Sequence, residues 1–344
     1  MFRKIISMIL MAVLISGCAV PKMGQEKEVN KKQYQATFLT LFDTVTTIIG
    51  YAETEEEFGE ITDTIYAELE KYHKLFDIYK DYEVNNIKTI NDQAGIAPVK
   101  VEREIIELLL DCKEYYNVTK GKVNAAMGSV LYLWHEARND GLDDPAHAYL
   151  PDPQKLEAAA QHCNFDDVII DEEKSTVYIC DPDLRLDVGA IAKGWSVQQV
   201  AETAPAGLLI SVGGNVCPTG PKDENGTPWV VGVTNPDGGD YLHTIYTTTS
   251  SVVTSGDYQR TYMVDGQLYH HIIDPQTLYP STYWRSVTIV CEDSGLADAL
   301  STALFLLPQA EGQALLTQCG AEAMWVDAAG DRFYSPGFET LIRT

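Results

Sequence analysis

The sequence predicts an α+β protein in which mixed or antiparallel sheets pack against helices. Two observations carry this prediction. Amphipathic helical patterns dominate the first part of the chain, and short β-rich runs with few helices dominate the second. Strands that follow one another in runs, with helices set apart, favour α+β over a doubly wound parallel sheet, in which strands and helices alternate.

The N-terminal elements follow from local patterns. Residues 35–51 are rich in Thr, Val, Ile and aromatic residues, with a break at residues 42–43, and predict strands. Thr54 and Glu57 form a capping box in front of an apolar stripe that ends at Phe76. This stripe recurs every three or four residues, so a packing helix is expected.

Later elements are shorter. A second apolar helical pattern covers residues 102–116, and a turn-rich stretch ends where Pro153, behind Asp152, starts a short helix. Helical patterns at residues 192–203 and 296–306 interrupt the β-rich runs. These runs are residues 168–170, 177–179, 208–212, 229–233, 242–248 and 287–290.

Length and charge limit the class of protein. A chain of 344 residues allows one large domain or two intimate ones. Since 45% of the residues are hydrophobic and 22% are charged, the body of the chain is expected to fold. With 25 basic and 50 acidic residues the net charge is -25, which argues against nucleic-acid binding. A phosphorylated ligand would therefore need a neutralising group other than bulk charge.

The N-terminus has the pattern of a bacterial lipoprotein signal peptide over residues 1–17. Arg3 and Lys4 precede an apolar run at residues 5–15, and a small-residue site leads to Cys18. The run is too short to span a bilayer. Cys18 is the expected lipidation site, and an ordinary cleaved signal with an incidental cysteine is the alternative.

Residues 18–33 are polar and lack apolar periodicity, so they are expected to form a lipidated tether in front of a domain at 34–344. The predicted location is the extracytoplasmic face of the cell membrane.

Six further cysteines show no C-x-x-C spacing and no histidine at metal-ligand spacing, which gives no support to a zinc or dithiol site. They are Cys112, Cys163, Cys180, Cys217, Cys291 and Cys319.

Two glycine-containing stretches follow apolar strands. In residues 186–194, small residues let the backbone approach a ligand, Asp187 offers a carboxylate, and Lys193 offers a positive charge near phosphate. A tight strand-to-helix turn with a solvated lysine explains the same pattern equally well. In residues 211–215, paired glycines favour a hairpin turn over a ligand cradle.

Residues 254–258 and 269–275 combine hydroxyl, histidine and carboxylate side chains. A histidine beside a carboxylate can act as a base for a hydroxyl nucleophile. A histidine in a strand is more often a packed or hydrogen-bonded side chain. The doublet His270-His271 keeps both interpretations open.

Residues 297–304 form an apolar helical pattern that contains Asp298 and Thr302, four positions apart and hence on one face. Oxygen ligands with few charges suit magnesium bound together with a substrate phosphate. The alternative is an aspartate that favours the helix dipole and a threonine that bonds back to a carbonyl.

Seven motifs in this order resemble the ApbE family of FAD:protein FMN transferases, over Thr40 to Tyr334. They are residues 41–44, 123–128 with Leu133-Trp134, 186–194, 211–214, 254–258, 271–275 and 297–302. Any one would be weak, but the seven in sequence are specific. The resemblance implies an α+β fold of the T-fold type.

The resemblance also implies site residues. The expected magnesium ligands are the backbone carbonyl of Ala190, the Asp298 carboxylate, the Thr302 hydroxyl and Ser301. The expected FAD contacts are Phe42, Tyr79, Lys122, Val123, Asn124, Asp187, Lys193 and Ile273. Two departures stand out: Asn124-Ala125-Ala126 replaces Asp-Pro-Thr, and Leu278 replaces a glycine, which would strain the chain if φ is positive there.

The implied reaction is magnesium-dependent transfer of FMN from FAD to a threonine hydroxyl of an exported or membrane-bound acceptor, with release of AMP. The acceptor is expected to be an electron-transfer protein with an Asp-Gly-x-Thr-Gly type of segment. His271 is the expected base and Asp274 its orienting partner, with Asp257 or a metal-bound oxygen as alternative bases. The alternative functions are a magnesium-dependent FAD pyrophosphatase, a non-catalytic flavin-binding lipoprotein and a generic solute-binding lipoprotein.

Overall fold

The computed structural model describes residues 5–7 and 31–343. Cys18 and most of the predicted signal peptide lie outside this part. Within the two described ranges, no helix is both long enough and apolar enough to cross a bilayer.

A nine-stranded sheet, antiparallel at every pairing, forms the centre of the molecule. Its strands in spatial order are β1 (Ile5–Ser7), β2 (Lys32–Leu41), β3 (Thr44–Ala52), β7 (Leu208–Val212), β8 (Asn215–Pro218), β11 (Ser251–Gly256), β14 (Ser286–Cys291), β15 (Glu322–Val326) and β16 (Arg332–Tyr334). The edge strand β1 belongs to the predicted signal peptide.

Three small sheets complete the β structure. They are β9 (Trp229–Val233) with β10 (His243–Thr247), β12 (Tyr262–Val264) with β13 (Gln267–Tyr269), and β4 (Val99–Lys100), β6 (Thr176–Ile179) and β5 (Val168–Asp171) in that spatial order. Their pairings are antiparallel too.

The α-helices are α1 (Glu55–Phe76), α2 (Ile87–Asp92), α3 (Arg103–Val118), α4 (Gly128–Asp143), α5 (Pro153–Ala159), α6 (Ala192–Thr203), α7 (Ser294–Phe305) and α8 (Gln309–Cys319). Short 3-10 turns occur at Ala125–Met127, Pro145–His147, Ala160–His162, Phe165–Asp167 and Phe338–Leu341.

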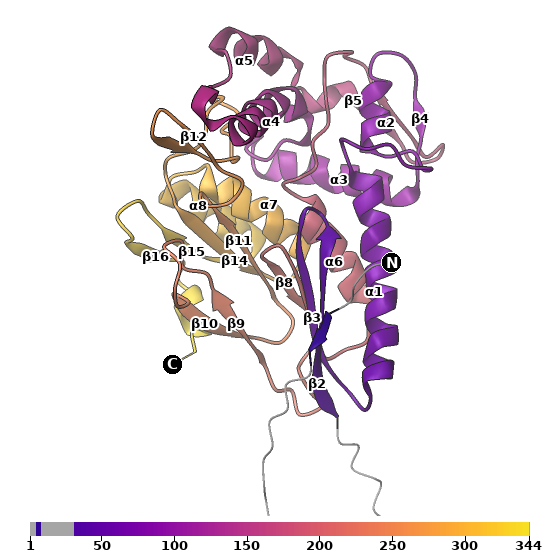
Figure 1. The fold of residues 1–344 in the computed structure, drawn as a ribbon, viewed down its shortest axis with the longest axis vertical. Coiled ribbons are helices and arrows are strands. Elements are labelled where there is room, and N and C mark those ends of the chain that lie inside the picture. Colours follow the sequence, from indigo (N-terminus) through magenta and orange to yellow (C-terminus); the bar gives the residue numbers. More distant parts are fainter. Residues whose placement is uncertain (1–4, 8–30, 344) are drawn as a thin grey trace, which may run out of the picture.

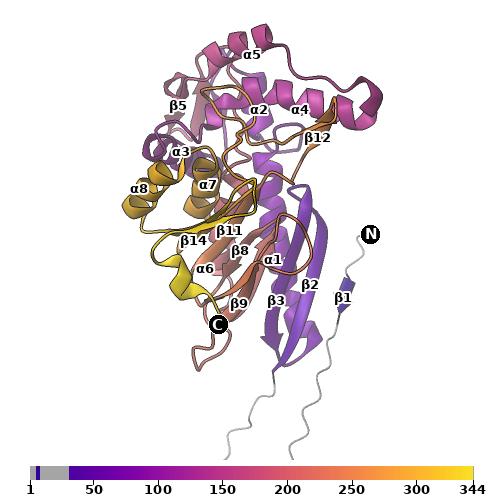
Figure 2. The same ribbon diagram turned by 90° about the vertical axis from the view of Figure 1, so that its left-hand side faces the viewer.

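The elements form layers around the sheet. Helices α1, α6 and α7 cover one face of the sheet, and their buried side chains form the main core with it. The β9–β10 hairpin packs a smaller core on the strands β7, β11, β14 and β15. Helices α4 and α5 and the β12–β13 hairpin lie together beyond one end of the sheet, at the top of Figures 1 and 2.

Helix α1 shows how the sequence pattern leads to this packing. The Thr54 hydroxyl accepts the Glu57 N–H at 3.2 Å, which satisfies one free donor of the first turn. The Glu57 carboxylate accepts the N–H of Glu53. In a standard capping box it would accept the N–H of the N-cap residue, Thr54. Phe58 and Leu69 of the predicted stripe are completely buried. The predicted helix is confirmed.

The sequence patterns did not predict some elements of the fold. Helix α4 begins at one glycine and contains another, Gly141, and its apolar face is short. Strand β11 is made largely of small and hydroxyl residues, which propensity does not favour as a central strand. It lies between β8 and β14 with α7 packed on it, so tertiary context overrides the local preference.

Candidate functional site

A cavity of about 900 Å³ is lined by loops and element ends that are far apart in the sequence. All eight residues predicted to contact FAD line it, as do His271, Ala190, Asp298 and Thr302. Ser301 and Asp274 do not line it. The fold therefore brings most of the predicted site residues to one place.

The Asp298 carboxylate is buried, with 3% of the residue exposed, on the first turns of α7. Its Oδ2 accepts the Gly194 N–H at 2.9 Å and lies 3.3 Å from Lys193 Nζ. Within residues 31–343, the contact found for its Oδ1 is the longer one of 3.5 Å to Lys193. One carboxylate oxygen thus keeps most of its capacity for a further partner.

The carbonyl of Ala190 lies just before the N-cap of α6, which is Ile191. Gly194 is in the first turn, where backbone N–H groups have no partner inside the helix, and its N–H donates to Asp298. No hydrogen bond to the Ala190 carbonyl is present among the described residues. A carbonyl oxygen and a carboxylate oxygen without full partners therefore occur in one cavity wall.

The close approach of α6 and α7 depends on this glycine. A Cβ added at Gly194 would lie 2.3 Å from the Ser294 carbonyl oxygen and 2.5 Å from the Asp298 Cβ. No side chain fits there without moving one helix. Residues 186–194 can therefore form a tight strand-to-helix turn and line a ligand site at the same time.

Thr302 and Ser301 are differently placed. Thr302 lines the cavity one helical turn after Asp298. Ser301 is completely buried, and its hydroxyl bonds to the Asp298 carbonyl at 2.8 Å and to the Ser255 hydroxyl at 2.7 Å. Ser301 lies behind the cavity wall, and its part in a metal site stays a prediction.

These donors fit a hard divalent cation. A carbonyl oxygen, a carboxylate and a hydroxyl are oxygen ligands of the kind that magnesium takes together with substrate phosphates. Among the described residues, the Asp298 carboxylate and the Ala190 carbonyl both have unused acceptor capacity. Lys193, which also lines the cavity, suits the phosphate of a substrate and not the cation itself. Asp298 lies beyond the first turn of α7, so the alternative role as a helix-dipole group does not account for its position.

His271 is held as a neutral ring with a free nitrogen. Its Nδ1 lies 3.1 Å from the Gln259 carbonyl oxygen, which can only accept, so Nδ1 carries the proton. Burial, and then the charge of nearby Arg260, lower the pKa of His271 to about 3. The other nitrogen, Nε2, is therefore unprotonated at neutral pH and able to accept a proton.

The expected orienting role of Asp274 is wrong. Its carboxylate pairs with Lys122 Nζ at 3.1 and 3.2 Å and accepts the Gln276 N–H at 2.8 Å. Among the described residues, the partner of His271 is a backbone carbonyl, which sequence patterns do not reveal. Asp274 instead fixes Lys122 at the cavity wall through a nearly buried ion pair.

His270 and Asp257, the other side chains considered as the base, bond to groups elsewhere in the fold. His270 donates from Nε2 to the Ser281 carbonyl at 2.8 Å and accepts the Ile272 N–H at Nδ1, so both nitrogens are used. Asp257 pairs with Arg285 and does not line the cavity. Burial raises the pKa of Asp257. The histidine doublet thus divides into a structural His270 and a cavity-lining His271.

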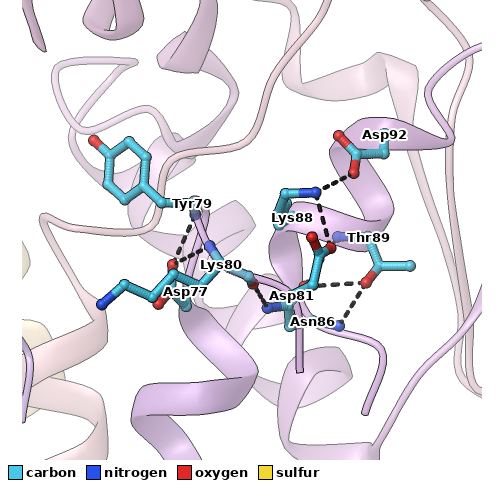
Figure 3. A network of polar contacts seen from close by, with 8 residues as sticks. All are labelled: Asp77, Tyr79, Lys80, Asp81, Asn86, Lys88, Thr89 and Asp92. Carbon is cyan, nitrogen blue, oxygen red and sulfur yellow. Dashed lines mark hydrogen bonds and ion pairs between the residues drawn. The ribbon is translucent and has the colours of Figure 1, made fainter. Parts of the chain in front are cut away.

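A polar network after α1 sets the position of Tyr79 (Figure 3). The Asp77 carboxylate accepts the N–H groups of Tyr79 and Lys80 at 2.7 and 3.0 Å. Asn86 caps α2 and donates to the Lys80 carbonyl at 2.9 Å. These bonds hold the loop that follows α1, and Tyr79 lines the cavity.

His135 is a cavity residue that the sequence analysis missed. The Tyr79 hydroxyl lies 2.5 Å from His135 Nδ1, and His135 Nε2 lies 4.0 Å from the Asp187 carboxylate. Burial lowers the pKa of His135. This neutral histidine links two predicted FAD contacts. Its only signal was its place after Leu133-Trp134, inside a helix that the patterns did not predict.

Turns at the cavity adopt unusual backbone angles. Phe42 and Asp43 have φ values of 53° and 52° in the two-residue turn between β2 and β3. Gly213 and Gly214 form the predicted hairpin turn, with φ values of 56° and 98°, and also line the cavity. Leu278 has φ of 64°, so the strain expected at this position is present.

The fold and this cavity define an α+β protein with a large cavity lined by oxygen-bearing, basic and apolar residues. The chain belongs to the ApbE family, whose model matches residues 42–325. The predicted family is therefore confirmed.

Relatives and solved structures agree with this assignment. A protein from Treponema pallidum named FAD:protein FMN transferase is 34% identical over 260 residues, which cover 70% of each chain. One of the same name from Klebsiella pneumoniae is 32% identical and covers 71% of this chain and 78% of its own. The crystal structure of an ApbE protein from Thermotoga maritima, 29% identical, has a TM-score of 0.79 over 91% of this chain and all of that one. The predicted fold class is confirmed.

Proposed function

We propose that this chain is an FAD:protein FMN transferase that binds FAD with a magnesium ion and attaches FMN to a threonine of an exported acceptor protein. FMN transfer from FAD to a protein is the activity that the names of the family's curated members describe. The magnesium ion, the threonine and the membrane address are our extensions of it.

The single observation that supports the cation is that an Asp298 carboxylate oxygen and the Ala190 carbonyl, both of residues that line the cavity, keep free acceptor capacity among the described residues. The Ala190 carbonyl, the Asp298 carboxylate and the Thr302 hydroxyl would hold the ion. When bound, the cation supplies charge neutralisation for the pyrophosphate and polarises it. This resolves the conflict between an anionic substrate and a chain with a net charge of -25.

The chain's own residues have separate tasks in the proposed reaction. Lys193 and Lys122 provide positive charge along the cavity wall, and Tyr79 and Ile273 offer flat or apolar surfaces to the flavin. The acceptor hydroxyl oxygen forms a bond to the FMN-side phosphorus, and the bond from this phosphorus to the AMP oxygen breaks. AMP leaves with the electron pair, and the hydroxyl proton passes to His271 Nε2.

We further propose that lipidation of Cys18 holds the enzyme at the outer face of the cell membrane. Cleavage before Cys18 would remove β1, so that β2 becomes the edge strand of the mature sheet. Metabolic labelling with a fatty acid tests this address, because Cys18→Ser should lose both the label and the membrane association.

Mass spectrometry tests the reaction. The purified protein is mixed with FAD, magnesium and a test acceptor, a soluble carrier protein that bears an Asp-Gly-Ala-Thr-Gly segment. FMN bound to the threonine, with AMP in equal amount, is the expected result. Chelation by EDTA and a Thr→Ala acceptor are the controls. Free FMN without an adduct would indicate a pyrophosphatase, and intact FAD would indicate a binding protein.

A further inference from the structure

The cavity has a second half that the predicted FAD contacts do not use. None of the eight residues expected to touch FAD lies on β7, β8, β9 or β11. These strands nevertheless form a wall of the same cavity. Apolar side chains of Leu209, Val216 and Val252 contribute to it, with Val230 and Gly232 on β9.

Strand β9 has an unpaired edge. It pairs with β10 on one side, and no strand pairs with its other side within the described part of the chain. The outer edge of β10 is covered, because Ile245 forms a bridge with Ile342 and the Arg343 N–H donates to the Thr244 carbonyl at 2.7 Å. The free edge of the hairpin is thus the one that belongs to the cavity-lining strand.

This edge lacks the usual protection. Natural sheets block free edges with lysine, proline or bulges. The β9 sequence from Trp229 to Val233 carries none of these, and it pairs in regular register with β10. Its inward side chains Trp229, Val231 and Val233 are buried, so the strand is rigidly held while its edge stays open. A rigid, unprotected edge is suited to pairing with another extended segment.

An aromatic side chain beside this strand is also only partly covered. Tyr241 packs its ring against Gly232, where an added Cβ would lie 2.6 Å from the ring, yet the residue is 65% exposed. Tyr241 and Val230 both line the cavity. This exposed aromatic surface can pack against an incoming peptide segment.

We propose that the free edge of β9, with Tyr241 beside it, binds the acceptor protein by adding a segment of the acceptor as a strand. The inference rests on the proposed function, which requires a protein segment to enter the cavity that holds His271 and Asp298. Main-chain hydrogen bonds to β9 would hold the segment extended, and the Tyr241 ring would cover it. This recognition depends little on acceptor side chains, so it leaves the hydroxyl free to react.

Kinetics with the test acceptor separate this role from FAD binding. Tyr241→Ala and Val230→Asp are expected to raise the KM for the acceptor about tenfold, the equivalent of losing 1.4 kcal/mol of binding. The kcat at saturating acceptor and the FAD affinity, measured by flavin fluorescence, should change less than about twofold on the same scale. An N-methyl group on the peptide bonds next to the threonine of a synthetic Asp-Gly-Ala-Thr-Gly peptide should raise its KM in the same way.

Matched controls lie on the same molecule. Tyr246→Ala removes another exposed tyrosine of the hairpin that does not line the cavity, and Ile169→Asp adds a charge to an exposed strand position on β5. Both should leave the acceptor KM unchanged. An unchanged KM in Tyr241→Ala and Val230→Asp, or a loss of FAD affinity by the same factor, overturns the docking inference. A wild-type protein that forms no adduct overturns the proposed function instead.

Discussion

The N–H of Gly194 donates to the carboxylate of Asp298 at 2.9 Å, and this bond joins α6 to α7 at the floor of the cavity. It positions the carboxylate beside the turn that holds Ala190, whose carbonyl lies just before the N-cap of α6. The bond between two residues 104 positions apart thus brings the two halves of the proposed cation site together.

Asp298→Asn tests the charge at this site without removing the bond. The amide oxygen can still accept from Gly194, so the fold should persist, but the negative charge for a cation is lost. We expect FMN transfer to fall more than about 100-fold, since even changes beyond the direct ligands often reduce metal affinity 10–100-fold. The measurement is the rate of adduct formation over a magnesium titration. Asp293→Asn, at the exposed N-cap of the same helix, should retain full activity.

Gly194→Ala tests the helix approach. The new methyl group would overlap the Ser294 carbonyl, and we expect the free energy of unfolding to fall by about 1–3 kcal/mol, the range for overpacking. Magnesium-dependent transfer should fall with it. Gly59→Ala is the matched control, because an added Cβ there meets nothing within 4 Å and alanine favours α1 by about 1 kcal/mol. Equal stability of the two variants in urea unfolding would contradict the packing explanation.

Lys122 and Asp274 should be coupled in stability. Their side chains are only 12% and 9% exposed, so removing one partner leaves a nearly buried charge. Lys122→Met is expected to lower the free energy of unfolding by about 3–5 kcal/mol. The double variant Lys122→Met with Asp274→Asn should recover most of that loss, which a double-mutant cycle of urea unfolding measures. Independent, additive losses would refute the proposed structural role of Asp274.

His271 should make the stability of the FAD-free protein depend on pH. Its pKa is about 3 in the folded chain, below the value of about 6.5 for an unperturbed histidine. Above pH 6.5 both states are neutral and the residue has no effect. As pH falls below about 6.5, only the unfolded state takes up the proton, so stability falls progressively until about pH 3.

His271→Gln removes this titration, and its urea-unfolding free energy should fall less steeply than that of the wild type between pH 7 and pH 5. The same variant should lose most FMN transfer at pH 7, because glutamine cannot accept the proton. Parallel pH slopes in the two proteins would show that the histidine does not remain neutral in the fold.

Local sequence patterns are sufficient to predict the class of fold and many of the residues that line the cavity. The α1 stripe, the paired glycines of the β7–β8 turn and the spacing of Asp298 and Thr302 are local patterns, and each keeps its meaning in the structure. The order of the seven motifs along the chain is also enough to indicate its family.

Which of these groups meet depends on how the chain folds. The Gln259 carbonyl that orients His271, the Lys122 partner of Asp274 and the His135 link between Tyr79 and Asp187 all depend on contacts across the fold. Every residue has a backbone carbonyl, and no particular residue type marks a free strand edge. Such features arise from how distant segments pack, which periodicity along a chain does not encode.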